Sequence, residues 1–198
     1  MGLDLVYGKG QTPLSDEEKD GLKMRHIISQ GELNEMEQMN IQLAVEWTLG
    51  LETDPGLMLT EKFIRDLHKK MYGDVWKWAG EFRKTDKNIG VDWKQIPVAV
   101  RTLLDDCRFW IKENVFPPDE IAIRFKHRIV SIHCFPNGNG RHSRLMADLI
   151  ASRMFKTTVF GWGIKSYTDM KTAREQYISA LRKSDRQEPE ALIAFARS

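Results

Sequence analysis

Residues 133–144 read His-Cys-Phe-Pro-Asn-Gly-Asn-Gly-Arg-His-Ser-Arg, a glycine-containing run between two apolar segments. Apolar residues recur at helical spacing on both sides of this run. They are Ile121, Phe125, Ile129, Val130 and Ile132 before it, and Leu145, Leu149 and Ile150 after it. The run is therefore predicted to be a loop between two core helices, in which Gly138 and Gly140 let the backbone approach a ligand closely.

The composition of this loop suits the binding of phosphate groups. Backbone N–H groups at the start of a helix lack internal partners, and the helix dipole favours negative charge there. Gly138, Asn139 and Gly140 would supply such donors. Arg141 and Arg144 fall on one side of the following helix, and guanidinium groups bind phosphate oxygens in pairs. We therefore expect an anion-binding site at the start of this helix.

His133 precedes the predicted anion site and is the candidate general base. Its unperturbed pKa lies near neutrality, as base catalysis requires. A lone histidine after an apolar helix is usually structural, but the glycines and arginines that follow favour a catalytic role. Two alternatives stay open in the loop: the Asn139 side chain could form the turn instead of binding phosphate, and Arg144 could pair with a carboxylate. The loop alone indicates phosphate-ester transfer.

The same loop resembles the signature of the Fic (Fic/Doc) family, His-Pro-Phe-x-Asp/Glu-Gly-Asn-Gly-Arg-x-x-Arg. Two positions depart from it, since Cys134 replaces the proline and Asn137 replaces the acidic residue. In the family that acid holds the magnesium ion that bridges the nucleotide phosphates. An asparagine oxygen can coordinate a hard cation, but without charge. Asn137 is therefore the candidate metal ligand, and metal affinity is the property that this departure affects.

The resemblance implies a mainly α Fic fold, a helical bundle around a central motif loop with a small β-hairpin flap. Residues 78–83 read Trp-Ala-Gly-Glu-Phe-Arg and resemble a segment upstream of the family's loop. The flap follows, and in the family a target segment pairs with it as an added strand. A plain surface hairpin is the alternative. The candidate target-binding residues are Lys87, Asn88, Ile89, Gly90 and Val91.

Two further regions take roles from the resemblance. Tyr177 lies in a helix similar to the one that closes the family's nucleotide pocket, and a structural tyrosine is the alternative. Many members also carry an inhibitory helix whose glutamate pairs with the second arginine of the loop. Residues 29–35 hold the ingredients at a different spacing, so Glu32 and Glu35 are candidates for pairing with Arg144. The alternative is a solvated acidic helix start.

The resemblance covers roughly residues 60–195, so we divide the chain into an N-terminal arm with helices, residues 1–59, and a Fic domain, residues 60–198. Ser15 and Glu18 form a capping box that predicts a short helix. A long helix after Gly31 should stop near Gly50 and bury a stripe of apolar residues. That stripe is Leu33, Met36, Leu43, Ala44 and Trp47. The other expected helices span 60–71, 96–111, 118–132, 140–155, 167–183 and 188–197.

Composition bounds the remaining functional classes. A chain of 198 residues with 41% hydrophobic content can bury one good core. The net charge is +2 and no expected helix has a dense basic face, so direct nucleic-acid binding is not expected. No apolar run reaches membrane-spanning length, and the first residues do not resemble a signal peptide. Two cysteines without metal spacing fit a reducing, cytoplasmic setting.

The resemblance implies a protein adenylyltransferase that moves AMP from ATP to a Ser, Thr or Tyr hydroxyl of a target protein, with Mg²⁺ near Asn137. UMP transfer or phosphate transfer stays open. The alternative is a weakly active or inactive nucleotide-binding regulatory protein of a toxin–antitoxin-like pair. The loop is similar to that of the bacterial "mobile mystery protein B" group, which is encoded beside a helix-turn-helix partner. Asn137 favours this alternative.

Overall fold

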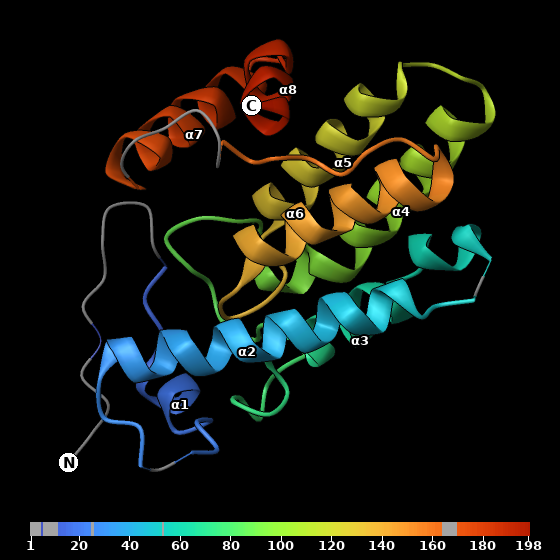
Figure 1. Cartoon of the computed structure of the whole chain (residues 1–198). Coiled ribbons are helices and arrows are strands. Elements are labelled where there is room, and N and C mark those ends of the chain that lie inside the picture. Colours follow the sequence, from blue (N-terminus) through green and yellow to red (C-terminus); the bar gives the residue numbers. More distant parts are fainter. Residues whose placement is uncertain (1–4, 6–11, 25, 53, 164–169) are drawn as a thin grey trace.

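The computed structural model describes residues 5, 12–24, 26–52, 54–163 and 170–198. Figure 1 shows a stack of helices, with the α2–α3 pair on one side, α4, α5 and α6 in the middle and the α7–α8 pair on the other side. The mainly α class is therefore confirmed. The elements are α1 (Asp16–Lys19), α2 (Gln30–Leu49), the 3-10 helix η1 (Pro55–Leu59), α3 (Glu61–Tyr72), the 3-10 helix η2 (Trp93–Gln95), α4 (Ile96–Lys112), α5 (Pro118–Ile132), α6 (Asn139–Leu149), the π-helix η3 (Ile150–Met154), α7 (Met170–Ser184) and α8 (Glu190–Arg197).

Local sequence signals set most helix starts. Ser15 caps α1 through the predicted capping box, and Thr60 caps α3 by accepting the Phe63 N–H. α5 begins at Pro118, where the missing N–H costs nothing. The helix after the loop is α-helical only to Leu149 and then continues as a π-helix. The first residues of the helix expected at 167–183 lie outside the described ranges.

α2 buries a different stripe from the one that the sequence suggested. Its buried side chains include two apolar residues, Leu33 and Ala44, whereas Leu43 is 56% exposed. Met36 and Trp47 are only half-buried. The buried face is mixed because its polar members Glu37, Asn40 and Thr48 all have hydrogen-bond partners. Glu37 and Asn40 bond to residues outside α2, and the Thr48 hydroxyl donates to the Val45 carbonyl of the same helix.

The flap does not form a β-hairpin, so that part of the predicted fold is wrong for the described residues. The backbone between α3 and η2 instead bonds to the end of α5 and to Arg83. The Val91 N–H donates to the Ile132 carbonyl over 3.3 Å, and the Arg83 N–H donates to the Cys134 carbonyl over 2.9 Å. An isolated antiparallel bridge joins Leu22 to Trp76 elsewhere.

One apolar core connects the N-terminal arm with the helices that hold the loop. Leu14 and Leu33 of the arm belong to the same cluster of buried side chains as Phe125 of α5 and Met146 of α6. The division at residue 59 stays a prediction. Within the described ranges, no helix combines the length and apolarity that a bilayer crossing demands.

Candidate active site

His133 is the residue that ends α5, and its backbone is left-handed, with φ 56° and ψ 61°. Its N–H still donates to the Ile129 carbonyl over 3.3 Å. A left-handed residue is a common way to end a helix, but it is usually glycine. The turn lets α5 give way to the loop, and the His133 side chain lines a cavity of about 690 Å³ there. Predicted phosphate-binding residues of the loop line the same cavity.

The His133 imidazole is neutral and has no partner. The residue is 6% exposed, and neither Nδ1 nor Nε2 has a hydrogen-bond partner among the described residues. Burial, together with the nearby positive charges of Arg83 and Lys87, lowers the pKa of His133 to about 4. A buried imidazole with a free nitrogen is ready to accept a proton from a hydroxyl group that enters the cavity.

Arg83 fixes the position of His133. Its side chain is fully buried, and it donates from Nε to the His133 carbonyl over 2.7 Å. It also donates to the carbonyls of Thr85, over 2.7 Å, and Val91, at the two ends of the flap. One guanidinium group therefore ties the flap to the base, with charge-assisted hydrogen bonds. Sequence reasoning placed Arg83 in a family segment but gave it no role.

The flap passes close to His133 at Gly90. A Cβ added at Gly90 would lie 2.7 Å from the His133 Cβ, and the Gly90 φ of +106° disfavours any other residue. Ile89 lines the cavity, whereas Asn88 is exposed. Lys87 points to the N-terminal arm, where its ammonium group pairs with Glu18. The five flap residues thus lie near the base, in different environments.

His68 and Phe135 pack against each other and hold the loop in place. The Gly80 N–H donates to His68 Nδ1 over 3.0 Å, so Nε2 carries the hydrogen and donates to the Asn137 carbonyl over 3.1 Å. The His68 ring stacks on Phe135 with ring centroids 3.7 Å apart. His142 is 1% exposed, and its ring bonds to the Ile64 carbonyl over 3.0 Å. No sequence motif identified these two histidines as loop supports.

Two asparagine side chains are used inside the loop. Asn139 Oδ1 accepts the Phe135 N–H over 2.9 Å, and its Nδ2 donates to the Phe135 carbonyl over 2.8 Å. This is the turn-forming alternative, and it leaves only the Asn139 backbone for phosphate. Asn137 Oδ1 accepts the Gly138 N–H over 2.6 Å. A Cβ at Gly138 would lie 2.5 Å from the Tyr72 ring, whereas Gly140 has open space.

These residues do not fit a magnesium ion that the protein itself holds. Asn137 offers a neutral oxygen that is already bonded to the Gly138 N–H. In the described part of the chain, no cluster of three His, Cys, Asp or Glu side chains could hold a metal ion. Magnesium is normally held by one or two carboxylates together with substrate phosphates. A metal ion at this loop would therefore depend on the nucleotide for its charged ligands.

Arg141 is occupied by a buried carboxylate that sequence reasoning missed. Glu37 of α2 is 4% exposed, and its Oε2 lies 2.6 Å from Arg141 Nη2. The other oxygen, Oε1, accepts the Trp76 Nε1–H over 2.7 Å. Glu37, Arg141 and Trp76 all line the cavity. A glutamate on the same helix face as Leu33 and Ala44 was the sequence signal.

The two glutamates that the sequence suggested do not reach Arg144. Glu32 completes the capping box of α2, where its Oε2 accepts the Ser29 N–H over 3.1 Å. Glu35 is exposed. Arg144 instead lies over the ring of Tyr177, with 5.7 Å between the guanidinium carbon and the ring centroid. The expected pairing with Arg144 is therefore absent among the described contacts.

Tyr177 of α7 lines the cavity opposite the loop. Its hydroxyl group accepts a hydrogen bond from Lys126 Nζ, and the ammonium nitrogen lies 4.3 Å from the ring centroid. Lys126 is fully buried, and burial places its pKa well below the usual value. Both the predicted role in nucleotide binding and the structural alternative fit this position.

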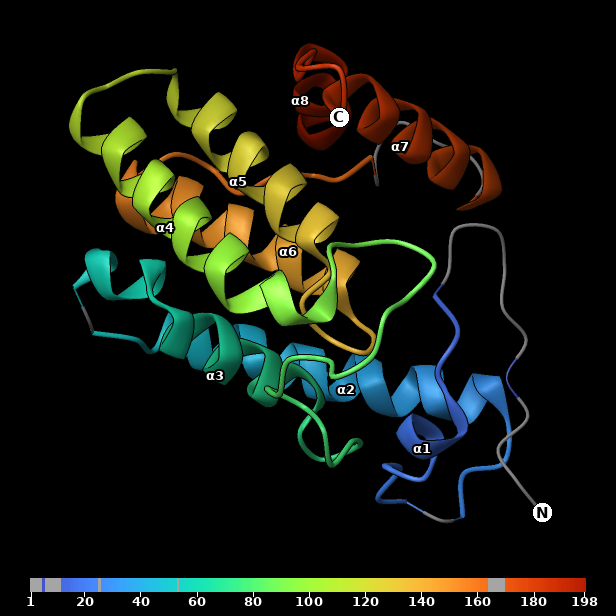
Figure 2. The same ribbon diagram turned by 180° about the vertical axis from the view of Figure 1, so that it is seen from behind.

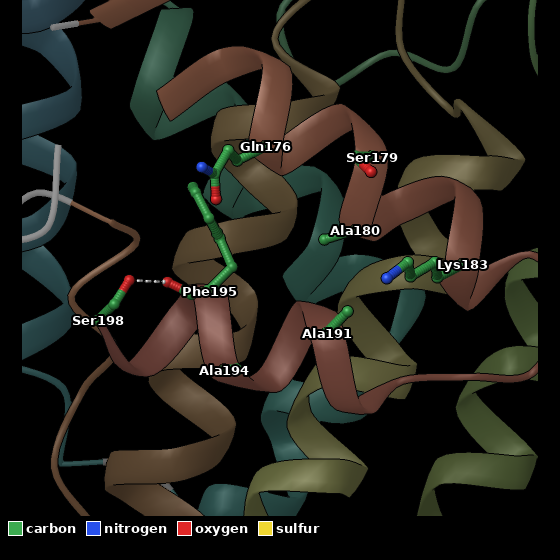
Figure 3. Close-up of a pocket in the computed structure, with 8 residues that line it drawn as sticks. All are labelled: Gln176, Ser179, Ala180, Lys183, Ala191, Ala194, Phe195 and Ser198. Atoms are coloured by element: carbon green, nitrogen blue, oxygen red, sulfur yellow. Dashed lines mark hydrogen bonds between the residues drawn. The ribbon is translucent and has the colours of Figure 1, made fainter. Parts of the chain in front are cut away.

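A second cavity, of about 310 Å³, lies between α7 and α8, and Figure 3 shows its lining. Its only charged side chain is that of Lys183. The larger cavity, which is lined by an unpartnered base and three arginines, Arg141, Arg144 and Arg174, is therefore the candidate active site.

Residues 58–151 match the model of the Fic/DOC family. Two curated relatives are named protein adenylyltransferase Fic. The one from Drosophila grimshawi is 32% identical over 101 residues, which are 49% of this chain and 21% of that protein. The one from Aedes aegypti is 29% identical over 99 residues, or 48% and 20%. The chain thus spans about a fifth of the length of the curated relatives it matches.

Solved structures share the fold. The N-terminal FIC domain of the Bep8 protein from Bartonella sp. 1-1C has a TM-score of 0.68 at 12% identity, covering 90% of each chain. A Fic-1 fragment from C. elegans has a TM-score of 0.63 at 18% identity, covering 80% of this chain and 46% of the other. Likeness at such identity concerns the fold alone. The family match shows that residues 58–151 form a Fic/DOC family domain.

Proposed function

We propose that the chain is a protein adenylyltransferase, which transfers AMP from ATP to a hydroxyl group of a target protein. One observation carries the proposal: a neutral, unpartnered His133 lines the same cavity as the start of α6, Arg141 and Arg144. The curated relatives that bear this name support it, within the matched half of the chain.

In the proposed reaction, a free nitrogen of His133 takes the proton of the target hydroxyl group. The hydroxyl oxygen bonds to the α-phosphorus of ATP, and the bond to the β-phosphate oxygen breaks, so that pyrophosphate leaves. Backbone N–H groups at the start of α6 and the guanidinium groups of Arg141 and Arg144 stabilise the negative charge on the phosphates. Tyr177 forms the opposite wall of the nucleotide site.

Several finer proposals accompany this function. Mg²⁺ enters with the nucleotide and is held mainly by the phosphates. Asn137, which stands where the family has its acidic metal ligand, would offer its side-chain oxygen. A target segment lies along the flap at residues 87–91, near the base. We also infer a cytoplasmic location, because Cys107 and Cys134 are free thiols. A bacterial setting is inferred because the loop is similar to that of the "mobile mystery protein B" group.

We further propose that Glu37, not Glu32 or Glu35, restrains the activity. Its carboxylate neutralises Arg141 in the nucleotide cavity, where a phosphate group would need that guanidinium. A nucleotide that binds Arg141 must therefore displace a buried carboxylate, which raises the free energy of binding.

The second candidate function is a nucleotide-binding regulatory protein with little catalysis, as one half of a toxin–antitoxin-like pair with a helix-turn-helix partner. The neutral Asn137 at the metal position and the Glu37–Arg141 pair favour it, because both weaken the handling of phosphate charge. It predicts nucleotide binding without labelled product.

The test uses α-labelled ATP and, separately, γ-labelled ATP, each with Mg²⁺ and cell lysate. Protein-bound label from α-labelled ATP only, lost in His133→Ala and kept in a His26→Ala control, would establish AMP transfer. Label from γ-labelled ATP only would assign phosphate transfer instead. Binding of ATP without label, restored to labelling by Asn137→Asp, would favour the regulatory protein and attribute the inactivity to the metal position.

A further inference from the structure

Part of the N-terminal arm lines the cavity that also contains the flap residue Ile89 and the base His133. Leu5, Thr12 and Leu14 line the cavity together with His133 and the flap residue Ile89. Figure 1 and Figure 2 both show the blue segment before α1 running beside the green loop between α3 and α4. A segment of the chain itself therefore lies where the flap meets the base.

Specific contacts hold this segment against the flap. Lys87 Nζ donates to the Pro13 carbonyl over 3.1 Å and pairs with the Glu18 carboxylate. The Lys87 and Glu18 side chains are only 7% and 13% exposed, so solvent weakens the pair little. Leu14 is 5% exposed and belongs to the core. The Pro13 carbonyl and the Leu14 side chain thus hold this segment against the flap and the core.

Thr12 is the hydroxyl residue that this arrangement leaves for chemistry. Among the described residues that line the cavity, hydroxyl groups occur only at Thr12 and Tyr177. The Tyr177 oxygen is bonded to Lys126, and burial raises the pKa of the Tyr177 hydroxyl. Pro13 disfavours the helical conformation for Thr12 and favours an extended backbone. An extended segment beside a loop is the form in which a peptide binds by strand addition.

We propose that Thr12 is an acceptor hydroxyl supplied by the chain itself, so that residues 12–14 act as a tethered target. The inference rests on the proposed function. His133 takes the proton from Thr12 Oγ, the oxygen bonds to the α-phosphorus of ATP, and pyrophosphate leaves with the electrons of the broken bond. The product is a phosphodiester between Thr12 and AMP. No second protein takes part in this step.

Tethering gives the reaction a kinetic signature. A hydroxyl group that the chain itself supplies to the cavity of its base reacts in a unimolecular step, whose rate per molecule does not depend on protein concentration. Transfer between two molecules would instead become faster in proportion to that concentration. The two routes can therefore be separated even when both produce the same modified residue.

The experiment incubates the full chain with α-labelled ATP and Mg²⁺ in the absence of other proteins. Cleavage after Lys9 and Lys19 gives a peptide with Thr12 and Ser15 as its hydroxyl residues. Fragmentation of this peptide should place one AMP group on Thr12, at a rate that is constant over a tenfold range of protein concentration. Thr12→Val, which keeps the side-chain shape, should remove the label, Thr12→Ser should retain it, and so should the Ser15→Ala control.

Other outcomes overturn the inference. Label on another residue, label that persists in Thr12→Val, or a rate that rises with protein concentration would each contradict a tethered acceptor. The same preparation is also tested with lysate, and all arms are repeated with Glu37→Gln to remove the proposed restraint. Labelled lysate proteins with an unmodified Thr12 would refute the inference and leave the proposed function standing. No label in any arm would refute both.

Discussion

At the scale of single residues, the environment of His133 makes a prediction about pH. Burial, and after it the charges of Arg83 and Lys87, together lower its pKa to about 4. The neutral imidazole is the active form, so activity is lost as the pH falls through this pKa. We expect the His133 limb of kcat/KM to lie near pH 4, with a flat profile from about pH 5 to 8. The measurement is the initial rate of AMP transfer at low ATP across this range.

A matched variant makes the cause testable. Lys87→Met removes one of the positive charges that lower the His133 pKa, and it should shift the acidic limb to higher pH. An exposed lysine of the same segment, Lys84, serves as the control, and Lys84→Met should leave the limb where it is. An acidic limb near the ordinary histidine pKa of about 6.5 would contradict a buried, unpartnered base.

Residue chemistry could be predicted from the sequence where a short motif carries it, and not where it depends on distant contacts. His133 and the arginines stand in one run of sequence, so their grouping could be predicted. Glu37 reaches Arg141 across 104 positions. The motif near Ser29 instead pointed to Glu32 and Glu35, of which Glu32 serves as part of the helix cap. Burial of a carboxylate becomes visible only when the partner helix is in place.

At the scale of elements, α2 should control nucleotide affinity through Glu37. Glu37→Gln removes the charge that occupies Arg141 and keeps an oxygen that can accept the Trp76 N–H. We expect ATP to bind more tightly, by roughly 5- to 150-fold, the usual range of coupling between sites. Titration calorimetry measures the Kd. Glu35→Gln, an exposed change on the same helix, is the control, and equal affinities in both variants would rule out the restraint.

The flap makes a second prediction at this scale. Gly90→Ala would set its Cβ against His133 and the Arg83 guanidinium, 2.7 Å and 2.8 Å away. The flap must then move, so we expect transfer to target proteins to fall by at least tenfold while ATP still binds. The control is Gly31→Ala in α2, where the added Cβ would lie 4.0 Å from its nearest neighbour, the Ser29 hydroxyl oxygen. Unchanged transfer in Gly90→Ala would mean that the flap does not align the acceptor.

The elements also show where sequence reasoning stops. Helix starts followed local caps, because a cap and the N–H group it binds are close neighbours in sequence. The flap was expected to be a hairpin from resemblance alone. Its backbone groups pair with Arg83 and with Ile132 instead of with one another. Ile132 is distant in sequence, and Arg83 is near but acts through its side chain, so alternation within the flap carries no information about either partner.

At the scale of the whole molecule, the core contains histidines that must stay neutral. Burial lowers the pKa of His142 to about 4 and also places that of His68 well below its usual value. A folded pKa below the unfolded value of about 6.5 contributes stability that is complete above pH 6.5 and is lost as the pH falls toward 4. For His142 alone the loss amounts to about 3 kcal/mol across that window.

Asp148 opposes this trend. Burial raises its pKa to about 6, so the folded state favours its protonated form and gains stability as the pH falls below 6. Three buried histidines against one such carboxyl group leave a net loss of stability in acid. We therefore expect the urea midpoint to decrease from pH 7 to pH 5.

His142 should account for part of the change in stability between pH 7 and pH 5. His142→Gln removes a titrating side chain, and its amide can still donate to the Ile64 carbonyl that His142 Nε2 contacts over 3.0 Å. Its stability should be lower at pH 7, yet it should change less between pH 7 and pH 5 than that of the parent chain. His26→Gln, at an exposed position, should keep the parent slope. If stability changes equally between pH 7 and pH 5 in both variants, protonation of His142 does not cause the acid sensitivity.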